Sequence, residues 1–235
     1  MTITSPHNAQ LKEIRKLSRQ RRRRDGAARF VAEGEDLLAA ADAAGWDPVE
    51  RYCAAGSGLP GVEVEAALLA AASGLGSGTR TLAVYEERWA GAPVGPLCVY
   101  LHGVHDPGNV GTILRSADAF GAASVAIGPG TADPFGPRAV RASMGAVFAV
   151  ALARAARIDE LPGPTVALVA RRGAPLHELS LAGATLLIGA EREGLPDEVV
   201  DGADLVARIP IANHSLNAAM AATVALYEAT RMARK

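Results

Sequence analysis

The sequence predicts an α/β protein built on parallel strands. Short apolar runs such as Leu97–Leu101, typical of strands buried on both faces, alternate with helical segments. A stretch rich in Gly and Pro, residues 89–96, has no periodicity and is predicted to be a linker. We therefore expect two domains, a smaller α/β domain over residues 1–90 and a larger parallel-sheet domain over residues 96–235.

The N-terminal part contains two expected helices and two expected strands. Residues 6–24 place Leu11, Ile14 and Leu17 at helical spacing, with Ser5 as the N-cap and Pro6 in the first turn. A second helix over residues 33–44 ends at a glycine. A short apolar segment at 29–32 leads into this helix, and strands are predicted at 49–54 and 81–85.

The C-terminal part continues the alternation. Strands are predicted at residues 97–101, 124–127, 147–150, 165–169, 185–188 and 205–209, and helices at 110–120, 137–143 and 215–232. Such an order indicates a parallel sheet with helices on both of its faces.

Composition limits the classes of function. Of the 235 residues, 49 % are apolar and 21 % are charged, as in an ordinary globular protein. The formal net charge is −1, so any contact with nucleic acid must use a local patch. Seven cations between Arg15 and Arg24, including Arg21, Arg22 and Arg23, form such a patch. A solvated helix end is the alternative interpretation.

The two cysteines lie in no metal-binding spacing, and we expect no metal site. A reducing, cytoplasmic location is expected, because there is no signal peptide and no apolar run long enough to span a membrane.

Three loops that follow predicted strands could carry chemistry: residues 105–115, 187–196 and 208–217. Asn109 could cap the helix after the first loop, and Ser215 could cap the last helix. Taken singly, each loop could equally be a capped helix or a polar turn. His214 could be a general base, but it has no partner in the sequence and is interpreted as a loop histidine. The glycine spacing fits neither a dinucleotide-binding fingerprint nor a P-loop.

Taken together, these loops resemble the three motifs of the SpoU/TrmH family of RNA 2′-O-methyltransferases. The segments that carry the resemblance are Asp106–Gly121, Leu187–Leu195 and Ile209–Asn217, with a linking segment at Asp133–Gly145. The resemblance implies an α/β-knot domain with a deep trefoil knot, S-adenosyl-L-methionine as the cofactor, RNA as the substrate and a homodimer whose interface lies near the active site. It implies no need for a metal.

The same resemblance implies the roles of individual residues. Gly189, Ile209 and Leu216 would hold the adenosine through main-chain and apolar contacts. Asn109, Arg115, Glu191, Ser215 and Asn217 would form the catalytic set, with the motif-one Asn and Arg facing the reacting ribose. The chain departs from the family pattern in motif three, where the loop is about two residues shorter and Ile211 replaces the usual Met.

Residues 5–88 resemble, more loosely, the L30e-like substrate-binding domain of many family members. This architecture favours ribosomal RNA over tRNA, and the cations Arg21, Arg22, Arg23 and Arg24 would contact RNA phosphates. Three alternatives stay open: a tRNA methyltransferase, a non-catalytic RNA-binding relative and, disfavoured by its glycine spacing, a nicotinamide oxidoreductase.

Overall fold

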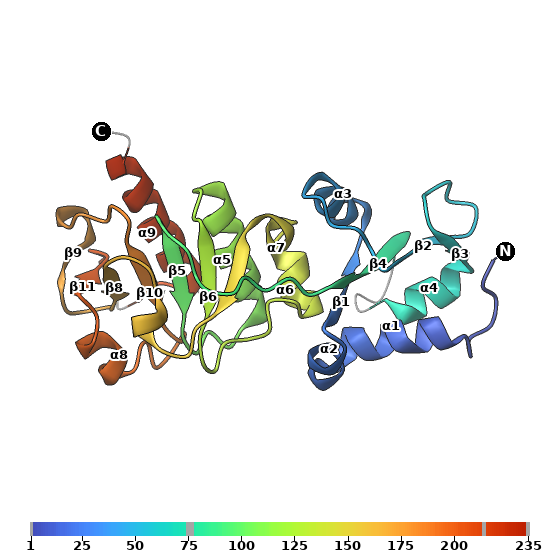
Figure 1. Ribbon diagram of the computed structural model, residues 1–235, viewed down its shortest axis with the longest axis horizontal. Helices are drawn as coiled ribbons and strands as arrows, with labels where there is room; N and C mark the ends of the chain where they lie inside the picture. The colour runs from blue at the N-terminus through green and yellow to red at the C-terminus, as the bar shows by residue number, and fades with distance from the viewer. Residues whose placement is uncertain (1, 74–77, 213–214, 234–235) are drawn as a thin grey trace.

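The computed structural model describes residues 2–73, 78–212 and 215–233. Its strands form two sheets that lie beside each other along the long axis of the molecule (Figure 1). The four-stranded sheet has the order β1-β4-β2-β3, with β1 (Arg29–Glu33), β2 (Glu50–Ala54), β3 (Val62–Val64) and β4 (Thr81–Glu86). Among the described strands of this sheet, β2 and β3 are the parallel pair, and β4 pairs antiparallel with β1 and β2.

The seven-stranded sheet has the order β7-β6-β5-β10-β8-β11-β9, and its neighbouring strands are all parallel. Its strands are β5 (Cys98–Leu101), β6 (Ser124–Ile127), β7 (Ala151–Arg154), β8 (Thr165–Leu168), β9 (Ala174–Pro175), β10 (Thr185–Ile188) and β11 (Leu205–Arg208). The predicted α/β class with a parallel sheet is confirmed. The trefoil knot stays a prediction.

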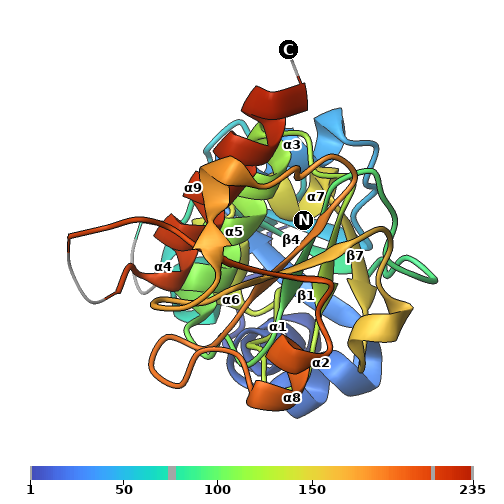
Figure 2. The same ribbon diagram turned by 90° about the vertical axis from the view of Figure 1, so that its left-hand side faces the viewer.

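Helices cover both faces of the larger sheet. Helices α5 (Pro107–Ala119) and α9 (Ala218–Ala233) pack on one face, and α8 (Asp197–Asp201) packs on the other (Figure 2). Along β5, Val99 and Leu101 point into the first core, whereas Cys98 and Tyr100 point into the second. The apolar run of β5 is therefore buried on both faces, as its composition predicts. In the described part of the chain, no helix is both long and apolar enough to cross a membrane.

Helices α1 (Ala9–Arg19), α2 (Arg21–Ala27), α3 (Glu35–Ala43) and α4 (Ala66–Ala72) lie beside the N-terminal sheet (Figure 1). Helices α6 (Pro137–Ala142) and α7 (Ala146–Ala149) pack against α5 and lie between the two sheets (Figure 1). The predicted N-cap Ser5 is wrong. The side-chain oxygen of Asn8 accepts the backbone N–H groups of Gln10 and Leu11, so the first helix begins three residues later. Extended backbone at Gln20 then separates α1 from α2.

The strand predicted at residues 147–150 is also wrong. Those apolar residues belong mainly to the short helix α7, and the strand β7 follows it. Gly145, in the left-handed region with φ +98°, starts the turn into α7. Because Val147 and Phe148 are buried in either conformation, their hydrophobicity alone could not distinguish helix from strand. The short elements β3, α4 and β9 were not predicted from the sequence.

The predicted linker, residues 89–96, connects the two sheets but is held by specific contacts. Trp89 packs edge-on against Phe135, with ring centroids 5.2 Å apart. The backbone N–H of Ala90 donates to the carbonyl of Leu152 at 2.7 Å. The segment therefore lies against the outer strand β7 of the larger sheet.

Candidate active site

The three motif loops meet at one edge of the seven-stranded sheet. They follow β5, β10 and β11, and the carboxyl ends of parallel strands lie at the same edge. There the loops after β8, β10 and β11 border a cleft with about 740 Å³ of empty space, including open solvent.

All three predicted cofactor residues line this cleft: Gly189, Ile209 and Leu216. Glu191 and Ser215 of the predicted catalytic set line it as well. Its walls are otherwise mainly apolar, with contributions from Leu168, Val169, Ala170, Ile188, Ile211, Ala218 and Ala221. The cleft therefore has a mainly apolar lining, with the carboxylate of Glu191 at its border.

Glycine at position 189 is required by the close approach of two backbone segments. A Cβ atom there would lie 2.3 Å from both the carbonyl carbon of Gly194 and the nitrogen of Leu195. Backbone atoms cannot move aside as the end of a side chain can. The loop after β10 therefore closes tightly against the end of its own strand, and Gly189 borders the cleft with main chain only.

Glu191 joins motif two to motif one through its carboxylate. Its Oε1 accepts the side-chain N–H of Asn109 at 2.8 Å and the backbone N–H of Asp106 at 3.2 Å. Its Oε2 accepts the backbone N–H of His105 at 3.3 Å. With three donors on two oxygens, this carboxylate organises the loop rather than presenting an unused base.

Asn109 and Asn217 extend this network to motif three. The Nδ2 group of Asn217 donates to Oδ1 of Asn109 at 3.0 Å. The Oδ1 of Asn217 accepts the backbone N–H groups of Ala219 and Met220, so Asn217 is the N-cap of α9. The expected caps at Ser215 and Asn109 are therefore wrong, and Asp106 caps α5 through its bond to Gly108.

The hydrogen bonds to Glu191 also set its ionisation. Partial burial acts to raise the pKa of Glu191, but the bonds from Asn109 and the backbone N–H groups outweigh it, and its pKa lies below the ordinary value of 4.5. A carboxylate whose pKa is lower in the folded than in the unfolded chain stabilises the fold, and this stabilisation is complete at pH values above the pKa of the unfolded chain. That stabilisation is lost as the pH falls through the lowered folded value.

We therefore expect the Asn109–Glu191 contact to persist from neutral pH down to 4.5 and to open below it. The side-chain amide resonances of Asn109 and Asn217, followed by NMR during an acid titration, measure this. The amide of Asn8, which caps α1 without a carboxylate partner, is the control. A transition of the Asn109 resonance above pH 4.5 would contradict the assignment.

Arg115 lies exposed on α5, beyond Asn109 along the helix. In the part of the chain that the structure describes, no hydrogen bond or ion pair holds its guanidinium. His214, interpreted from the sequence as a loop histidine rather than a general base, is outside the described residues.

The four arginines predicted to contact RNA do not share one environment. Arg21 and Arg23 are exposed and pair with Asp25 at 3.7 Å and Glu13 at 2.5 Å. Arg22 is exposed without an ion pair to any described residue. The prediction for Arg24 is wrong, because this side chain is 7 % exposed and its guanidinium is bound to Asp133.

Sequence reasoning missed the wall of the cleft that follows β8. Leu168, Val169 and Ala170 contribute to it, and Arg192 of motif two stands at its border. The segment after β8 contains no recognisable motif. The strand order would have indicated this wall, because β8 lies between β10 and β11 and ligands bind beyond the carboxyl ends of neighbouring parallel strands.

Comparison with known proteins identifies the larger sheet and its loops. The SpoU rRNA methylase family matches residues 96–227, which is more than half of the chain. The chain belongs to this family. The matched region contains all three loops and the converging Asn109, Glu191 and Asn217.

Two similar proteins resemble the chain beyond this region. A crystal structure of an AdoMet-bound rRNA methyltransferase from Sinorhizobium meliloti has a TM-score of 0.88 and 32 % identity, covering 99 % of this chain and 98 % of that one. An uncharacterized tRNA/rRNA methyltransferase of Mycobacterium bovis is 32 % identical over 97 % of this chain and 91 % of its own length.

The 23S rRNA (guanosine(2553)-2′-O)-methyltransferase RlmP of Bacillus subtilis is 34 % identical over 133 residues. That match covers 53 % of this chain, and the chain spans only about half, 54 %, of the length of RlmP.

Proposed function

We propose that this SpoU protein binds S-adenosyl-L-methionine in the cleft and methylates a ribose 2′-hydroxyl of RNA. One observation carries the proposal. Asn109, Glu191 and Asn217, one from each motif, form a continuous chain of hydrogen bonds at the border of an apolar cleft. A cofactor pocket and a polar substrate side therefore adjoin at the carboxyl ends of the strands.

The cleft suits the proposed cofactor. Ile209 and Leu216 offer apolar surface to an adenine ring, and the bare backbone of Gly189 lets a flat ligand approach the main chain. The carboxylate of Glu191 and the hydroxyl of Ser215 lie at the border of the same cleft. S-adenosyl-L-methionine supplies an electrophilic methyl group, and its sulfur departs as a neutral thioether that needs no acid.

The residues of the chain then have to orient the ribose and stabilise charge on its oxygen. Methylation makes an O–C bond and releases the proton of the 2′-hydroxyl, so negative charge develops on that oxygen. Arg115 is suited to this task because its planar guanidinium can bind a phosphate and the reacting oxygen together. Glu191 acts indirectly, by holding Asn109 and the backbone of the motif-one loop.

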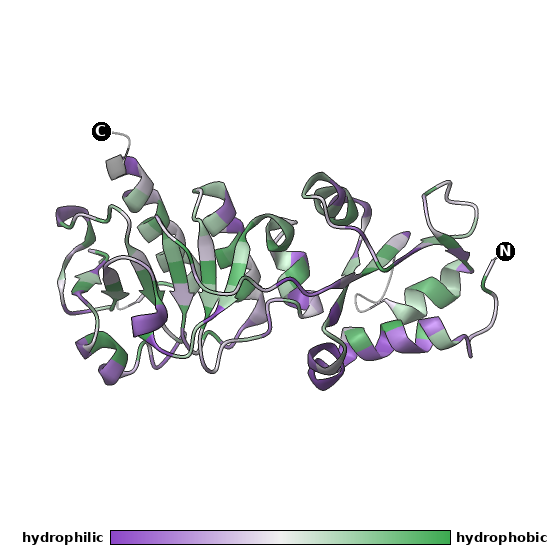
Figure 3. Cartoon of the chain, in the orientation of Figure 1, coloured by the Kyte–Doolittle hydropathy of each residue, from purple (hydrophilic) through white to green (hydrophobic). Residues whose placement is uncertain are grey.

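The N-terminal helices are proposed to bind RNA phosphates. Helices α1 and α2 lie on the lower side of the molecule in Figure 1, toward which the ends of β5 and β6 also point. Their outer faces are strongly hydrophilic (Figure 3). RNA bound along α2 could therefore extend toward the motif loops.

Replacing Arg21 and Arg22 together by Ala is expected to weaken RNA binding and flatten its salt dependence. Each arginine that no longer binds a phosphate should reduce the slope of log K against log salt concentration by about 0.7–0.9. Fluorescence anisotropy with labelled rRNA fragments at several salt concentrations measures the slope. Arg80→Ala, an exposed arginine paired with Glu35, is the matched control. An unchanged slope in the double variant would exclude α2 as a phosphate-binding helix.

Ribosomal RNA is the proposed substrate class. All three proteins compared above carry rRNA in their names, and one of them resembles this chain over 99 % of its length. tRNA is the second candidate, because the name of the M. bovis relative includes both RNA classes.

The chain is further proposed to form a homodimer through α9. Met220, Val224 and Tyr227 are 62 %, 40 % and 55 % exposed and share one face of this helix. An apolar stripe of this kind is typical of a protein–protein interface. Met220→Glu should shift the protein from dimer to monomer in sedimentation velocity. Val62→Glu, an exposed apolar residue of β3, should not. A monomeric wild-type protein would overturn this proposal.

The whole proposal is tested by transfer of radiolabelled methyl groups to total rRNA and total tRNA from cells that lack this gene. Label in rRNA at a position resistant to alkaline cleavage supports rRNA 2′-O-methylation. Label in tRNA alone would move the substrate class to tRNA. Cofactor binding without label in either pool would reject naked mature RNA as the substrate. No cofactor binding would favour a non-catalytic RNA-binding role.

A further inference from the structure

A buried ion pair joins helix α2 to the larger sheet. The Nε and Nη2 groups of Arg24 lie 2.8 Å and 2.7 Å from Oδ2 of Asp133, and the two side chains are 7 % and 11 % exposed. The remaining Nη1 group donates to the carbonyl of Leu17 at 2.7 Å. Oδ1 of Asp133 accepts the backbone N–H of Phe135. Every nitrogen of the guanidinium and both carboxylate oxygens are therefore engaged.

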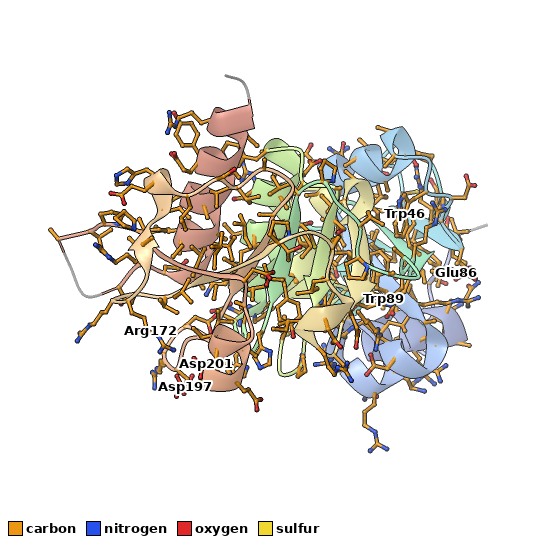
Figure 4. The ribbon with its side chains drawn as sticks, turned by 60° about the vertical axis from the view of Figure 1, so that its left-hand side comes forward. Trp46, Glu86, Trp89, Arg172, Asp197 and Asp201 are labelled. Atoms are coloured by element: carbon orange, nitrogen blue, oxygen red, sulfur yellow. The ribbon has the colours of Figure 1, made fainter. Side chains whose placement is uncertain are left out.

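A cluster of aromatic side chains beside the ion pair also connects the two sheets. Phe30 of β1 packs against Phe135 at a centroid distance of 4.8 Å, and the indole N–H of Trp46 donates to the carbonyl of Phe148 at 2.9 Å. Trp46 and Trp89 both lie where the two sheets meet (Figure 4). One apolar core thus runs from the four-stranded sheet into the larger sheet.

The segment that carries Asp133 also touches the motif-one loop. The backbone N–H of Gly103 donates to the carbonyl of Pro129, and that of Ala132 donates to the carbonyl of Val104, each at 2.9 Å. The ring Nδ1 of His105 lies 2.8 Å from the carbonyl of Gly130, which can only accept a hydrogen bond. Helix α2 is therefore connected to the motif-one loop, and through the backbone of that loop to Glu191, by successive hydrogen bonds.

We propose that Arg24 is a positioning residue that determines which nucleotide is methylated. This inference rests on the proposed function. The ion pair with Asp133 holds the exposed Arg21, Arg22 and Arg23 at a fixed distance from the motif loops. RNA anchored by its phosphates on α2 then presents one nucleotide, at one separation, to Arg115. Removing an ion pair from water is costly, so such a pair is a poor source of stability and a better source of fixed geometry.

The first test compares Arg24→Gln with Arg22→Ala on rRNA from cells lacking this gene, with methylated positions mapped by alkaline cleavage. Arg24→Gln should lower methylation at the wild-type position by about 10²-fold, because small misplacements of a substrate are costly. It should also spread label to neighbouring nucleotides and leave the salt slope of RNA binding unchanged. Arg22→Ala should flatten that slope and keep the methylated position.

An unchanged methylation map in Arg24→Gln would overturn the positioning role. If Arg24→Gln fails to bind S-adenosyl-L-methionine, Asp133→Asn takes its place, because it removes the charge but keeps an oxygen for the N–H of Phe135. The absence of any methylation by the wild-type protein would instead reject the proposed function.

A second measurement needs no activity. Spin labels on cysteines introduced at Lys12 and Glu198, both exposed, report the distance between α1 and α8. Cys53 and Cys98 are buried and are not expected to react. Pulsed electron resonance should give one narrow distance distribution, and a broad one after Arg24→Gln or Asp133→Asn. A distance distribution that is broad in the wild type, or one that stays narrow in the variants, would overturn the inference.

Discussion

Replacing Arg115 by Ala is expected to lower the rate of methyl transfer by about 10²–10³-fold, the usual cost of removing a group that stabilises transition-state charge. The stability of the fold should change little, because Arg115 is exposed and no described residue pairs with it. Cofactor binding should also persist, since Arg115 does not line the cleft. The loss should therefore appear in kcat rather than in the affinity for S-adenosyl-L-methionine.

Single-turnover methylation of rRNA and equilibrium dialysis of the labelled cofactor measure the two quantities separately. Asp118→Ala is the matched control, because Asp118 is exposed on the same helix one turn further along. Its rate should equal that of the wild type. Normal turnover by Arg115→Ala would remove this residue from the catalytic set, and an equal loss in Asp118→Ala would attribute the effect to the helix as a whole.

Gly189→Ala is expected to abolish cofactor binding. The added methyl group would lie 2.3 Å from backbone atoms of Gly194 and Leu195, so the loop after β10 must shift away from the end of the strand. Overpacking of this kind costs about 1–3 kcal/mol of stability. The loop shift would also displace Glu191, and with it the contact to Asn109.

Isothermal titration with S-adenosyl-L-methionine and urea denaturation measure the two effects of this change. Gly91→Ala is the control, because a Cβ atom there meets nothing within 4 Å and the backbone is not left-handed. It should bind the cofactor normally. Wild-type affinity in Gly189→Ala would place the cofactor elsewhere.

The parallel sheet and the gathering of its loops were predictable because both follow from general rules. Apolar runs such as Leu97–Leu101 indicate doubly buried strands, and parallel strands bring their carboxyl ends to one edge. The pairing of Asn109 with Glu191 and Asn217 was not predictable from spacing. Asn109 resembles a helix N-cap in the sequence, but in the fold Asp106 caps the helix. The side-chain amide of Asn109 is therefore free to bridge the other two motifs.

Arg24 shows where a charge pattern misleads. Four consecutive arginines resemble one exposed surface, and an unbroken helix over residues 6–24 gives no reason to separate the last of them. The extended backbone at Gln20 starts a new helix with a different orientation. Three arginines of that helix then face outward and the fourth faces Asp133, 109 residues further along the chain. Only a long-range contact distinguishes them, and no local propensity encodes it.

The strand order of the larger sheet bears on how the protein is made. Strand β10 lies between β5 and β8, and β8 lies between β10 and β11, so the middle of the sheet cannot close until residues near 208 have left the ribosome. Asn217 joins the motif network later still. Contacts that span so much of the chain form slowly and late. We therefore expect nascent chains that end before α9 to lack the methyl-transfer site, even where their first sheet has already folded.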